Sequence, residues 1–445
     1  MARRLFGTDG VRGRAGEFLT AELALALARA AVERCAAQRP QVLIVRDTRE
    51  SGEMLEAAIA AGVTAAGGDA LLGGVLPTPA APLLVRARGL ALAAVISASH
   101  NPYQDNGIKL FAADGFKLDD ESEQQIEQAL EAPCRPPARI GSVRHLDDAL
   151  EGYLQALERR FAALDLSGRR ILLDCANGAT FRAAPEVFRR LGADVETLSA
   201  APDGRNINAG CGSTHIASLA DAVARGGFHL GFAFDGDGDR VLAVDADGAV
   251  VDGDELVALA ALHLKAQGRL IGGGVAVTVM SNYGFQVAMT QAGIKVATTA
   301  VGDRYVLEEL RRRGWTLGGE QSGHIIELSF SPTGDGIASA LLTLEALGGR
   351  DLRERAAMRR LPQRLVNVRA RDRAALRAAT EARELREAVA RAQDSLAGRG
   401  RVLVRESGTE PLIRVMVEAP TAEEADEVCE RLATLAAGIL GAAVA

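Results

Sequence analysis

A strand–helix–strand pattern occurs three times along this chain of 445 residues. Each copy begins with an apolar run and a polar turn, continues through a helical stretch that ends at glycine, and closes with a second apolar run. The copies begin at QVLIVRDTRES, RRILLDCANGAT and GVAVTVMSNYG, which are residues 41–51, 169–180 and 274–284. The glycines that end the helical stretches are Gly67 and Gly68, Gly192, and Gly293. Glycine suits a left-handed helix C-cap, and strands joined through a helix pair in parallel, so the pattern predicts three related α/β units.

Each unit is followed by another apolar run that ends in a polar loop. In α/β sheets, ligands bind outside the carboxyl ends of the strands, so these loops would face one shared site. We therefore predict an α/β fold, with three similar α/β (mixed-sheet) domains around a central cleft and a smaller C-terminal α+β domain. The predicted domains are residues 1–150, 151–253, 254–365 and 366–445. In the last domain, the Arg-rich residues 371–392 are predicted to form a solvated surface helix.

The overall charge and the cysteines limit the partners and the compartment. With 51 basic and 58 acidic residues the net charge is −7, which disfavours nucleic acid as a partner. The N-terminus lacks the apolar run of a signal peptide, and the longest uncharged apolar stretch is shorter than the ~20 residues of a membrane span. We therefore expect no membrane association. Five widely spaced cysteines without a CxxC pair favour a reducing, cytoplasmic location.

The segment FDGDGDR is the best candidate for a metal site. Asp235, Asp237 and Asp239 alternate with glycines, and carboxylates this close repel one another unless a cation neutralises them. Oxygen ligands favour Mg²⁺ or Ca²⁺. An EF-hand calcium loop is excluded, because its sixth residue would be Arg240 instead of Gly and its twelfth Ala246 instead of Glu. We predict one bound divalent cation.

The segment ISASHNPYQDNGIK carries a candidate nucleophile. Ser99 follows an apolar run and precedes His100, and Ser97 is the alternative hydroxyl. Lys109, ten residues further on, adds a nearby cation. No GxSxG motif surrounds the serine, so a hydrolase triad is not expected.

Two further loops carry groups that suit a sugar and a phosphate. In GGEQSGH, Glu320, Ser322 and His324 alternate, and in an extended loop they would point the same way. Glu and Ser suit sugar hydroxyls, and His could position a proton or a phosphate. The segment RESGTEPLIR offers several hydrogen-bond donors that could bind a phosphate. They are Arg405, Ser407, Gly408, Thr409 and Arg414. The P-loop motif GxxxxGKS/T is absent from the sequence.

The segments SASHNP, DGDGDR, GEQSGH and RESGTEP occur here in the order found in the α-D-phosphohexomutases, and the chain resembles that family over essentially its whole length. Some stretches are similar to the members that act on amino sugars. These stretches are FGTDGVRG at residues 6–13, NINAGCGSTH at 206–215, VGDRYV at 301–306 and PTGDGI at 332–337. Gln321 agrees with this subgroup, because members that act on mannose and glucose phosphates typically have Met there.

The resemblance implies a phosphoserine enzyme. Ser99 would carry a phosphoryl group and complete a site for one Mg²⁺ per chain with Asp235, Asp237 and Asp239. The groups that would stabilise or position the phosphoryl group are Lys109, Arg240, Arg12 and His100. Sugar hydroxyls would bind Glu320 and Ser322, and the remote phosphate would bind Arg405, Ser407, Gly408, Thr409 and Arg414. Lys109 and His324 both stay candidates for the general acid and base.

The implied activity is that of an isomerase. It would convert glucosamine 6-phosphate into glucosamine 1-phosphate through a glucosamine 1,6-bisphosphate that reorients between two transfers, and so feed UDP-N-acetylglucosamine and cell-wall precursor synthesis. The expected partner is a sugar phosphate, and the oligomeric state is open, with a homodimer as one option. One alternative is a phosphomannomutase/phosphoglucomutase of the same family. Another is a Mg²⁺-dependent sugar phosphatase or a non-catalytic sugar-phosphate binding protein.

Overall fold

The chain divides into two compact units. The computed structural model describes residues 5–7, 9–130, 136–396, 398–406 and 411–441. The first unit contains residues 1–280 and 297–355, and the second contains residues 281–296 and 356–445. The described strands form four sheets, three in larger α/β layers and one in the C-terminal region. Among the described helices, none is long and apolar enough to cross a membrane.

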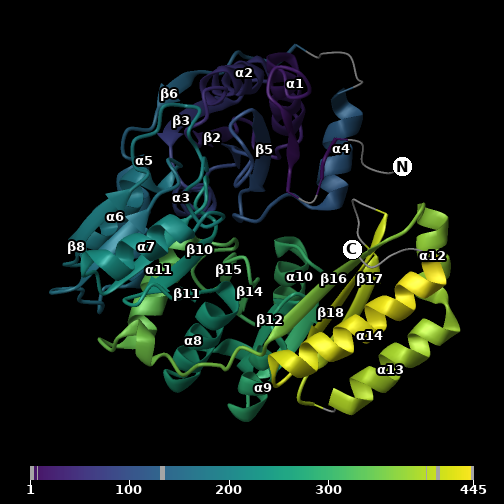
Figure 1. Cartoon of the computed structure of the whole chain (residues 1–445). Helices are drawn as coiled ribbons and strands as arrows, with labels where there is room; N and C mark the ends of the chain where they lie inside the picture. Colours follow the sequence, from purple (N-terminus) through teal and green to yellow (C-terminus); the bar gives the residue numbers. More distant parts are fainter. Residues whose placement is uncertain (1–4, 8, 131–135, 397, 407–410, 442–445) are drawn as a thin grey trace. The chain divides into compact units, whose positions relative to one another are not determined.

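The first sheet is mixed and has the strand order β1-β5-β4-β2-β3-β6. β2 is parallel to β3 and β4, whereas β5 runs antiparallel to β1 and β4. Helices α1 and α2 pack against each other beside this sheet (Figure 1). The elements are β1 (Val11–Arg14), α1 (Ala21–Val32), β2 (Gln41–Arg46), α2 (Gly52–Ala65), β3 (Asp69–Val75), α3 (Ala80–Arg88), β4 (Leu92–Ile96), β5 (Asp105–Ala112), α4 (Asp120–Leu130) and β6 (Val143–His145).

The second sheet has the order β11-β10-β9-β7-β8, with β7 parallel to β8 and β9 and with β10 antiparallel to β9. Its elements are α5 (Ala149–Arg160), β7 (Arg170–Asp174), α6 (Thr180–Arg190), β8 (Asp194–Leu198), α7 (Ala217–Gly226), β9 (Leu230–Phe234), β10 (Val241–Asp245) and β11 (Val250–Val251).

The third sheet has the order β13-β12-β14-β15, with β12 parallel to β14 and β14 antiparallel to β15. Its elements are α8 (Gly253–Ala266), the short helix η1 (Ile271–Gly273), β12 (Gly274–Thr278), α9 (Tyr283–Gln291), β13 (Lys295–Thr299), α10 (Asp303–Arg313), β14 (Leu317–Gly319), β15 (Ile325–Glu327), α11 (Gly336–Leu347) and the short helix η2 (Leu352–Glu354). The predicted strand–helix–strand units thus occur as β2-α2-β3, β7-α6-β8 and β12-α9-β13. Gly67, Gly192 and Gly293 have the positive φ expected after their helices, but Gly68 does not.

The C-terminal unit contains a small antiparallel sheet of order β16-β18-β17. Its elements are β16 (Gln363–Arg369), α12 (Arg373–Glu381), α13 (Arg383–Leu396), β17 (Arg401–Glu406), β18 (Leu412–Glu418) and α14 (Ala422–Leu440). The helices lie along one side of the sheet (Figure 1). The prediction of one helix over residues 371–392 is wrong: Ala382 has ψ 128° and separates α12 from α13, and both bury leucines in the core.

The second unit also includes α9, which the sequence pattern assigns to the third α/β domain. Asn282, the N-cap of α9, donates from Nδ2 to the backbone oxygen of Leu361 at 3.0 Å, and the Leu361 N–H donates back to Asn282 Oδ1 at 2.9 Å. Glu418 on β18 is fully buried and accepts the N–H of Tyr283 at 2.9 Å. These bonds fix the start of α9 to the C-terminal sheet. The four-domain α/β fold is as predicted, and the individual domain limits stay predictions.

Three buried strands lead into the candidate loops. β4, β9 and β14 have no exposed residue along their described length, so both faces of each strand are covered. A strand packed on both faces has little freedom to move, and the residues just beyond its end are held accordingly. Ser99 follows β4, Asp235 follows β9 and Glu320 follows β14. The fold therefore places the three loops on rigid supports.

Candidate active site

Ser99 and the aspartate loop, 136 residues apart in sequence, are in direct contact. The Ser99 hydroxyl donates to Asp235 Oδ2 at 2.5 Å and lies 3.3 Å from Nδ1 of His100. Ser99 is 2% exposed and has φ 52°, a left-handed conformation that is uncommon outside glycine. The alternative hydroxyl of Ser97 instead donates to Asp47 at 2.5 Å and accepts the Ser99 N–H at 3.0 Å. Of the two serines, it is Ser99 whose hydroxyl contacts the aspartate loop.

The three aspartates form a cluster that suits a divalent cation. Asp235, Asp237 and Asp239 are buried, and one carboxylate oxygen of each lies within 4.8 Å of the others. Oδ1 of Asp237 and Oδ1 of Asp239 are buried with no hydrogen-bond partner among the described residues. Burial, followed by the charges of Asp239 and Asp237, raises the pKa of Asp235 well above its usual value. A bound Mg²⁺ would supply the missing partner for these oxygens and relieve the repulsion.

Lys109 is the cation buried most deeply in the site. Its Nζ lies 2.8 Å from Asp237 Oδ2, 3.0 Å from Asp9 Oδ2 and 3.5 Å from Asp239 Oδ2. Burial acts to lower the pKa of Lys109, but the charges of Asp237 and Asp9 outweigh it and raise the pKa above its usual value. The same pairing lowers the pKa of Asp237 despite its burial. Lys109 is therefore held protonated beside the cluster.

Arg12, Arg240 and His100 complete this side of the site. Arg12 pairs with Asp9, and Arg240 Nε lies 3.8 Å from Asp239 Oδ1. The Nε atoms of both arginines are buried without a hydrogen-bond partner among the described residues. Burial and then the two guanidinium groups lower the pKa of His100, which favours its neutral form at pH 7. Two cations with unused N–H groups close to His100 and the aspartates suit an anionic group in this site.

The GGEQSGH loop is a hairpin turn between β14 and β15, so the extended shape in which Glu320, Ser322 and His324 would point the same way is not present. Gly323 has φ 90°, and its N–H donates to the Glu320 oxygen at 2.9 Å. As a result Glu320 and His324 are buried, whereas Ser322 is exposed. The turn packs against the aspartate loop, because the Val241 N–H donates to the Gly323 oxygen at 3.1 Å. Both ring nitrogens of His324 are buried without a hydrogen-bond partner among the described residues.

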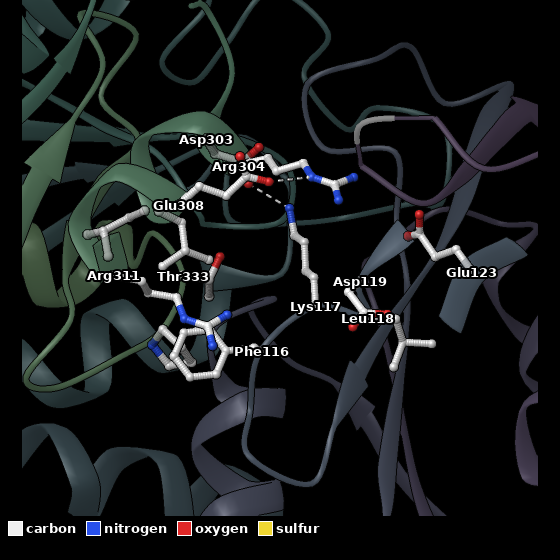
Figure 2. A pocket seen from close by; sticks show the side chains of 13 residues that line it. Phe116, Lys117, Leu118, Asp119, Glu123, Asp303, Arg304, Glu308, Arg311 and Thr333 are labelled. Carbon is white, nitrogen blue, oxygen red and sulfur yellow. Dashed lines mark hydrogen bonds and ion pairs between the residues drawn. The ribbon is translucent and has the colours of Figure 1, made fainter. Parts of the chain in front are cut away.

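Lys117 and Asp303, to which the sequence analysis assigned no role, connect the first and third α/β layers. Lys117, just after β5, donates to Asp303 Oδ2 at 2.6 Å and also contacts Asp9. Figure 2 shows Lys117 reaching toward Asp303 at the start of α10, beside a cavity of about 90 Å³ that Phe116 and Arg304 help to line. The charges of Asp303 and Asp9 raise the pKa of Lys117 although burial opposes them. Asp9 and Asp303 lie in FGTDGVRG and VGDRYV, but nothing in those strings identifies a shared partner.

The predicted phosphate loop belongs to the C-terminal unit. Ser407, Gly408 and Thr409 lie outside the described residues. Arg405 on β17 and Arg414 on β18 are directly opposite in the antiparallel register, so they share one face of the sheet. The role of Arg405 and Arg414 in binding a phosphate stays a prediction.

Comparison with known families matches nearly the whole chain. Profiles described as phosphoglucomutase/phosphomannomutase alpha/beta/alpha domains I, II and III match residues 3–134, 151–248 and 252–364, and the C-terminal domain profile matches residues 365–435. A curated phosphoglucosamine mutase from Moorella thermoacetica is 52% identical over 447 residues, covering 98% of this chain and 100% of that protein. The phosphoglucosamine mutase of Saccharopolyspora erythraea is 51% identical over 445 residues, covering 98% and 99%.

Solved structures share the fold at low sequence identity. A phosphoglucomutase/phosphomannomutase family protein from Burkholderia thailandensis superposes with a TM-score of 0.83 at 22% identity, covering 99% of this chain and 98% of that one. An Aspergillus fumigatus N-acetylphosphoglucosamine mutase, solved in complex with GlcNAc-6P and magnesium, gives a TM-score of 0.67 at 19% identity, covering 98% and 96%. These similarities concern the fold.

Proposed function

The chain belongs to the phosphoglucosamine mutases of the phosphohexomutase family, and we propose that Ser99 is the phosphoryl carrier in its reaction. It is an isomerase that interconverts glucosamine 6-phosphate and glucosamine 1-phosphate through a 1,6-bisphosphate. The observation that carries the assignment of Ser99 is its hydroxyl, which lies 2.5 Å from Asp235 inside a buried cluster of three aspartates. A phosphoryl group on that oxygen would meet the cluster's cation and the guanidinium groups of Arg12 and Arg240.

The aspartate cluster fits Mg²⁺ by donor type, spacing and its unpartnered oxygens. Asp235, Asp237 and Asp239 would hold one ion together with an oxygen of phosphorylated Ser99. When bound there, the cation would neutralise charge that builds on the phosphoryl oxygens. Lys109, held protonated by Asp237 and Asp9, contributes a further positive charge to the same oxygens.

The reaction consists of two phosphoryl transfers. In the first, the bond between phosphorus and Ser99 Oγ breaks, a bond to O1 of glucosamine 6-phosphate forms, the O1 hydroxyl gives its proton to a base, and Ser99 Oγ takes up a proton. The bisphosphate then reorients. In the second, the bond between phosphorus and O6 breaks, the bond to Ser99 Oγ forms again as its hydroxyl gives up its proton, and O6 takes up a proton. His324 is our candidate for moving these protons, since its ring nitrogens make no hydrogen bond among the described residues and Lys109 stays protonated.

Substrate binding is divided between the loops. Glu320 and Ser322 are proposed to hold sugar hydroxyls, and Arg405 and Arg414, with Ser407, Gly408 and Thr409, to hold the phosphate that is not being transferred. A binding site for the second phosphate is required in both orientations, because each end of the bisphosphate takes its turn at Ser99.

We also propose that the enzyme acts in the cytoplasm on a small sugar phosphate. Cys175 and Cys429 are buried as free thiols, which fits a reducing compartment. The net charge of −7 agrees with a small anion as partner, because the positive field needed is local to Arg12, Lys109 and Arg240.

Relative turnover tests the substrate. We expect a higher kcat/KM for glucosamine 6-phosphate than for mannose 1-phosphate or glucose 1-phosphate, each assayed with Mg²⁺ and a trace of hexose 1,6-bisphosphate. A preference for the neutral hexoses would assign the chain to the phosphomannomutase/phosphoglucomutase activity instead. Release of inorganic phosphate in place of the isomer would indicate a phosphatase.

A further inference from the structure

The backbone oxygen of Ser99 accepts hydrogen bonds from two side chains that come from different sheets. Arg49, after β2, donates from Nη2 at 2.9 Å, and Asn208, between β8 and α7, donates from Nδ2 at 2.9 Å. We propose that Arg49 and Asn208 are positioning residues that clamp this carbonyl and so hold the Ser99 hydroxyl against the aspartate cluster. The inference rests on the proposed role of Ser99 as phosphoryl carrier.

Arg49 directs both of its terminal nitrogens, Nη1 and Nη2, to the serine loop. Its side chain is completely buried, which is unusual for arginine. Nη2 also donates to the Asn101 oxygen at 2.9 Å, and Nη1 donates to the Asp105 oxygen at 2.9 Å and to the oxygen of Pro102. A guanidinium ion that binds four backbone oxygens of one seven-residue loop fixes the shape of that loop.

The charge of Arg49 is balanced by Asp47, which holds the other side of Ser99. Asp47 Oδ2 accepts from Arg49 Nε at 2.8 Å and from the Ser97 hydroxyl at 2.5 Å. Ser97 in turn accepts the Ser99 N–H at 3.0 Å. The N–H and the C=O of Ser99 are therefore both tied to one buried ion pair. A serine at φ 52° is strained, and the surrounding structure must compensate for that strain. These hydrogen bonds to the N–H and the C=O of Ser99 provide the compensation.

Asn208 carries the clamp across to the second α/β layer. It is 7% exposed, and its own backbone is held by the Ala176 oxygen, which accepts its N–H at 2.9 Å. Its amide reaches the Asn101 oxygen as well, at 3.3 Å. Gly236, between two of the clustered aspartates, packs on this contact: a Cβ there would meet the Ser99 oxygen at 2.6 Å and Asn208 Nδ2 at 2.7 Å. The clamp thus sets the position of Ser99 relative to the aspartate loop.

Positioning of this kind affects the transfer step more than substrate binding. Phosphoryl transfer depends on alignment of the attacking and leaving oxygens, and displacement of a reacting group by about 1 Å can cost ~10²-fold in rate. Arg49 and Asn208 are buried and donate to the backbone of the serine loop, so we expect neither of them to contact the sugar phosphate. Loosening the clamp should therefore lower kcat and leave KM nearly unchanged.

Substitutions at position 208 separate the clamp from a purely conformational role. Asn208 has φ 57°, and Asn, Asp and Gly all tolerate this conformation, but only Asn offers an N–H to the Ser99 oxygen. We expect Asn208→Gly to lower kcat about tenfold, and Asn208→Asp to lower it about 100-fold, because a carboxylate oxygen would face two carbonyl oxygens. In both variants KM for glucosamine 6-phosphate should stay within about twofold of the wild type.

Asn177→Gly is the matched control. Asn177 also has a positive φ, of 48°, but its side chain bonds to the backbone of Asn206 and Ala201 and not to the serine loop. Its kcat should stay within about twofold of the wild-type value. Each variant is compared by kcat per phosphorylated enzyme, with the phosphate content taken from intact mass and folding checked by melting temperature.

Arg49→Lys gives a second test from the other side of the clamp. Lysine keeps the charge opposite Asp47 but cannot serve four backbone oxygens, so kcat should fall about 100-fold or more. The clamp is refuted if Asn208→Gly and Asn208→Asp both keep kcat within about twofold of the wild type, or if their losses are confined to KM. The proposed role of Ser99 as phosphoryl carrier has a separate test. It would be refuted by a Ser99→Ala enzyme that is still active, whatever the kcat of the Asn208 variants.

Discussion

Lys109 is the residue whose removal tests the charge balance of the site most severely. It is fully buried between Asp9 and Asp237, at 3.0 and 2.8 Å, and the substitution Lys109→Met keeps a long apolar stem while removing the ammonium group. Asp9 retains its contacts with Arg12 and Lys117, but Asp237 retains only its bond from the Thr78 hydroxyl at 2.7 Å, among the described contacts. The variant therefore leaves Asp237 as a buried charge without a counter-ion when no metal is bound.

The stability lost in Lys109→Met follows from the distance between Lys109 Nζ and Asp237 Oδ2 and from the burial of both side chains. Two unit charges 2.8 Å apart attract by ~6 kcal/mol at an effective dielectric constant of ~20, and removal of one partner from a buried pair costs ~3–5 kcal/mol after the desolvation of the lost charge is counted. At ~2–4 °C for each kcal/mol, the melting temperature should fall by roughly 6–20 °C. Bound Mg²⁺ compensates the same carboxylates, so the deficit should be at least halved in its presence.

The assay is a thermal unfolding scan of wild type and Lys109→Met, each in EDTA and in excess Mg²⁺. Lys295→Met serves as the control, because Lys295 is exposed on β13 and its replacement should change the melting temperature by less than about 2 °C. A deficit for Lys109→Met that is equal with and without Mg²⁺ would refute the idea that the metal and Lys109 neutralise the same carboxylates.

Three further variants probe other parts of the structure. Gly236→Ala places a Cβ within 2.6 Å of the Ser99 oxygen and should cost ~1–3 kcal/mol of stability, with a fall in kcat. Gly438→Ala in α14 is the control, because its Cβ meets nothing within 4 Å and should not destabilise the protein. Equal melting temperatures for the two variants would contradict the packing described. Burial raises the pKa of Asp335 to about 7, so wild type loses stability from this group as pH rises from 4 to 7. Asp335→Asn cannot ionise, so its free energy of unfolding relative to wild type should rise across that window by up to ~1.4 kcal/mol per pH unit and level off above pH 8. A difference that stays constant with pH would show that Asp335 is not the titrating group. Arg405→Ala should raise KM for glucosamine 6-phosphate ~10–100-fold with little change in kcat, and an unaltered KM in initial-rate assays would remove Arg405 from the phosphate site.

Strands and their loops could be predicted from the sequence because local pattern determines them. The apolar runs before Ser99, Asp235 and Glu320 form fully buried strands, and the rule that ligands bind at strand ends pointed to the residues that follow. The cluster of three aspartates could also be predicted as a candidate cation site, because the repulsion of three carboxylates within five residues is a property of the segment itself.

Features that depend on contacts distant in sequence could not be predicted. Arg49 and Asn208 are 159 positions apart and meet on one carbonyl, and composition would place an arginine at the surface. The turn at Gly323 depends on a hydrogen bond from its N–H to the Glu320 oxygen and on a hydrogen bond from the Val241 N–H. The alternation of residue types therefore could not show that Glu320 and His324 are buried while Ser322 is exposed. The break at Ala382 between α12 and α13 likewise lies within a segment whose composition favours helix throughout.

The role of Ser99 as phosphoryl carrier can be measured directly from the phosphate that it carries. Purified enzyme would be incubated with glucosamine 1,6-bisphosphate and Mg²⁺, and its intact mass and the modified peptide determined by mass spectrometry. One phosphate is expected on Ser99, and it should still be present after turnover of glucosamine 6-phosphate because the second transfer restores it. Ser99→Ala should show neither phosphate nor isomerisation. A Ser99→Ala enzyme that isomerises glucosamine 6-phosphate at the wild-type rate would contradict it.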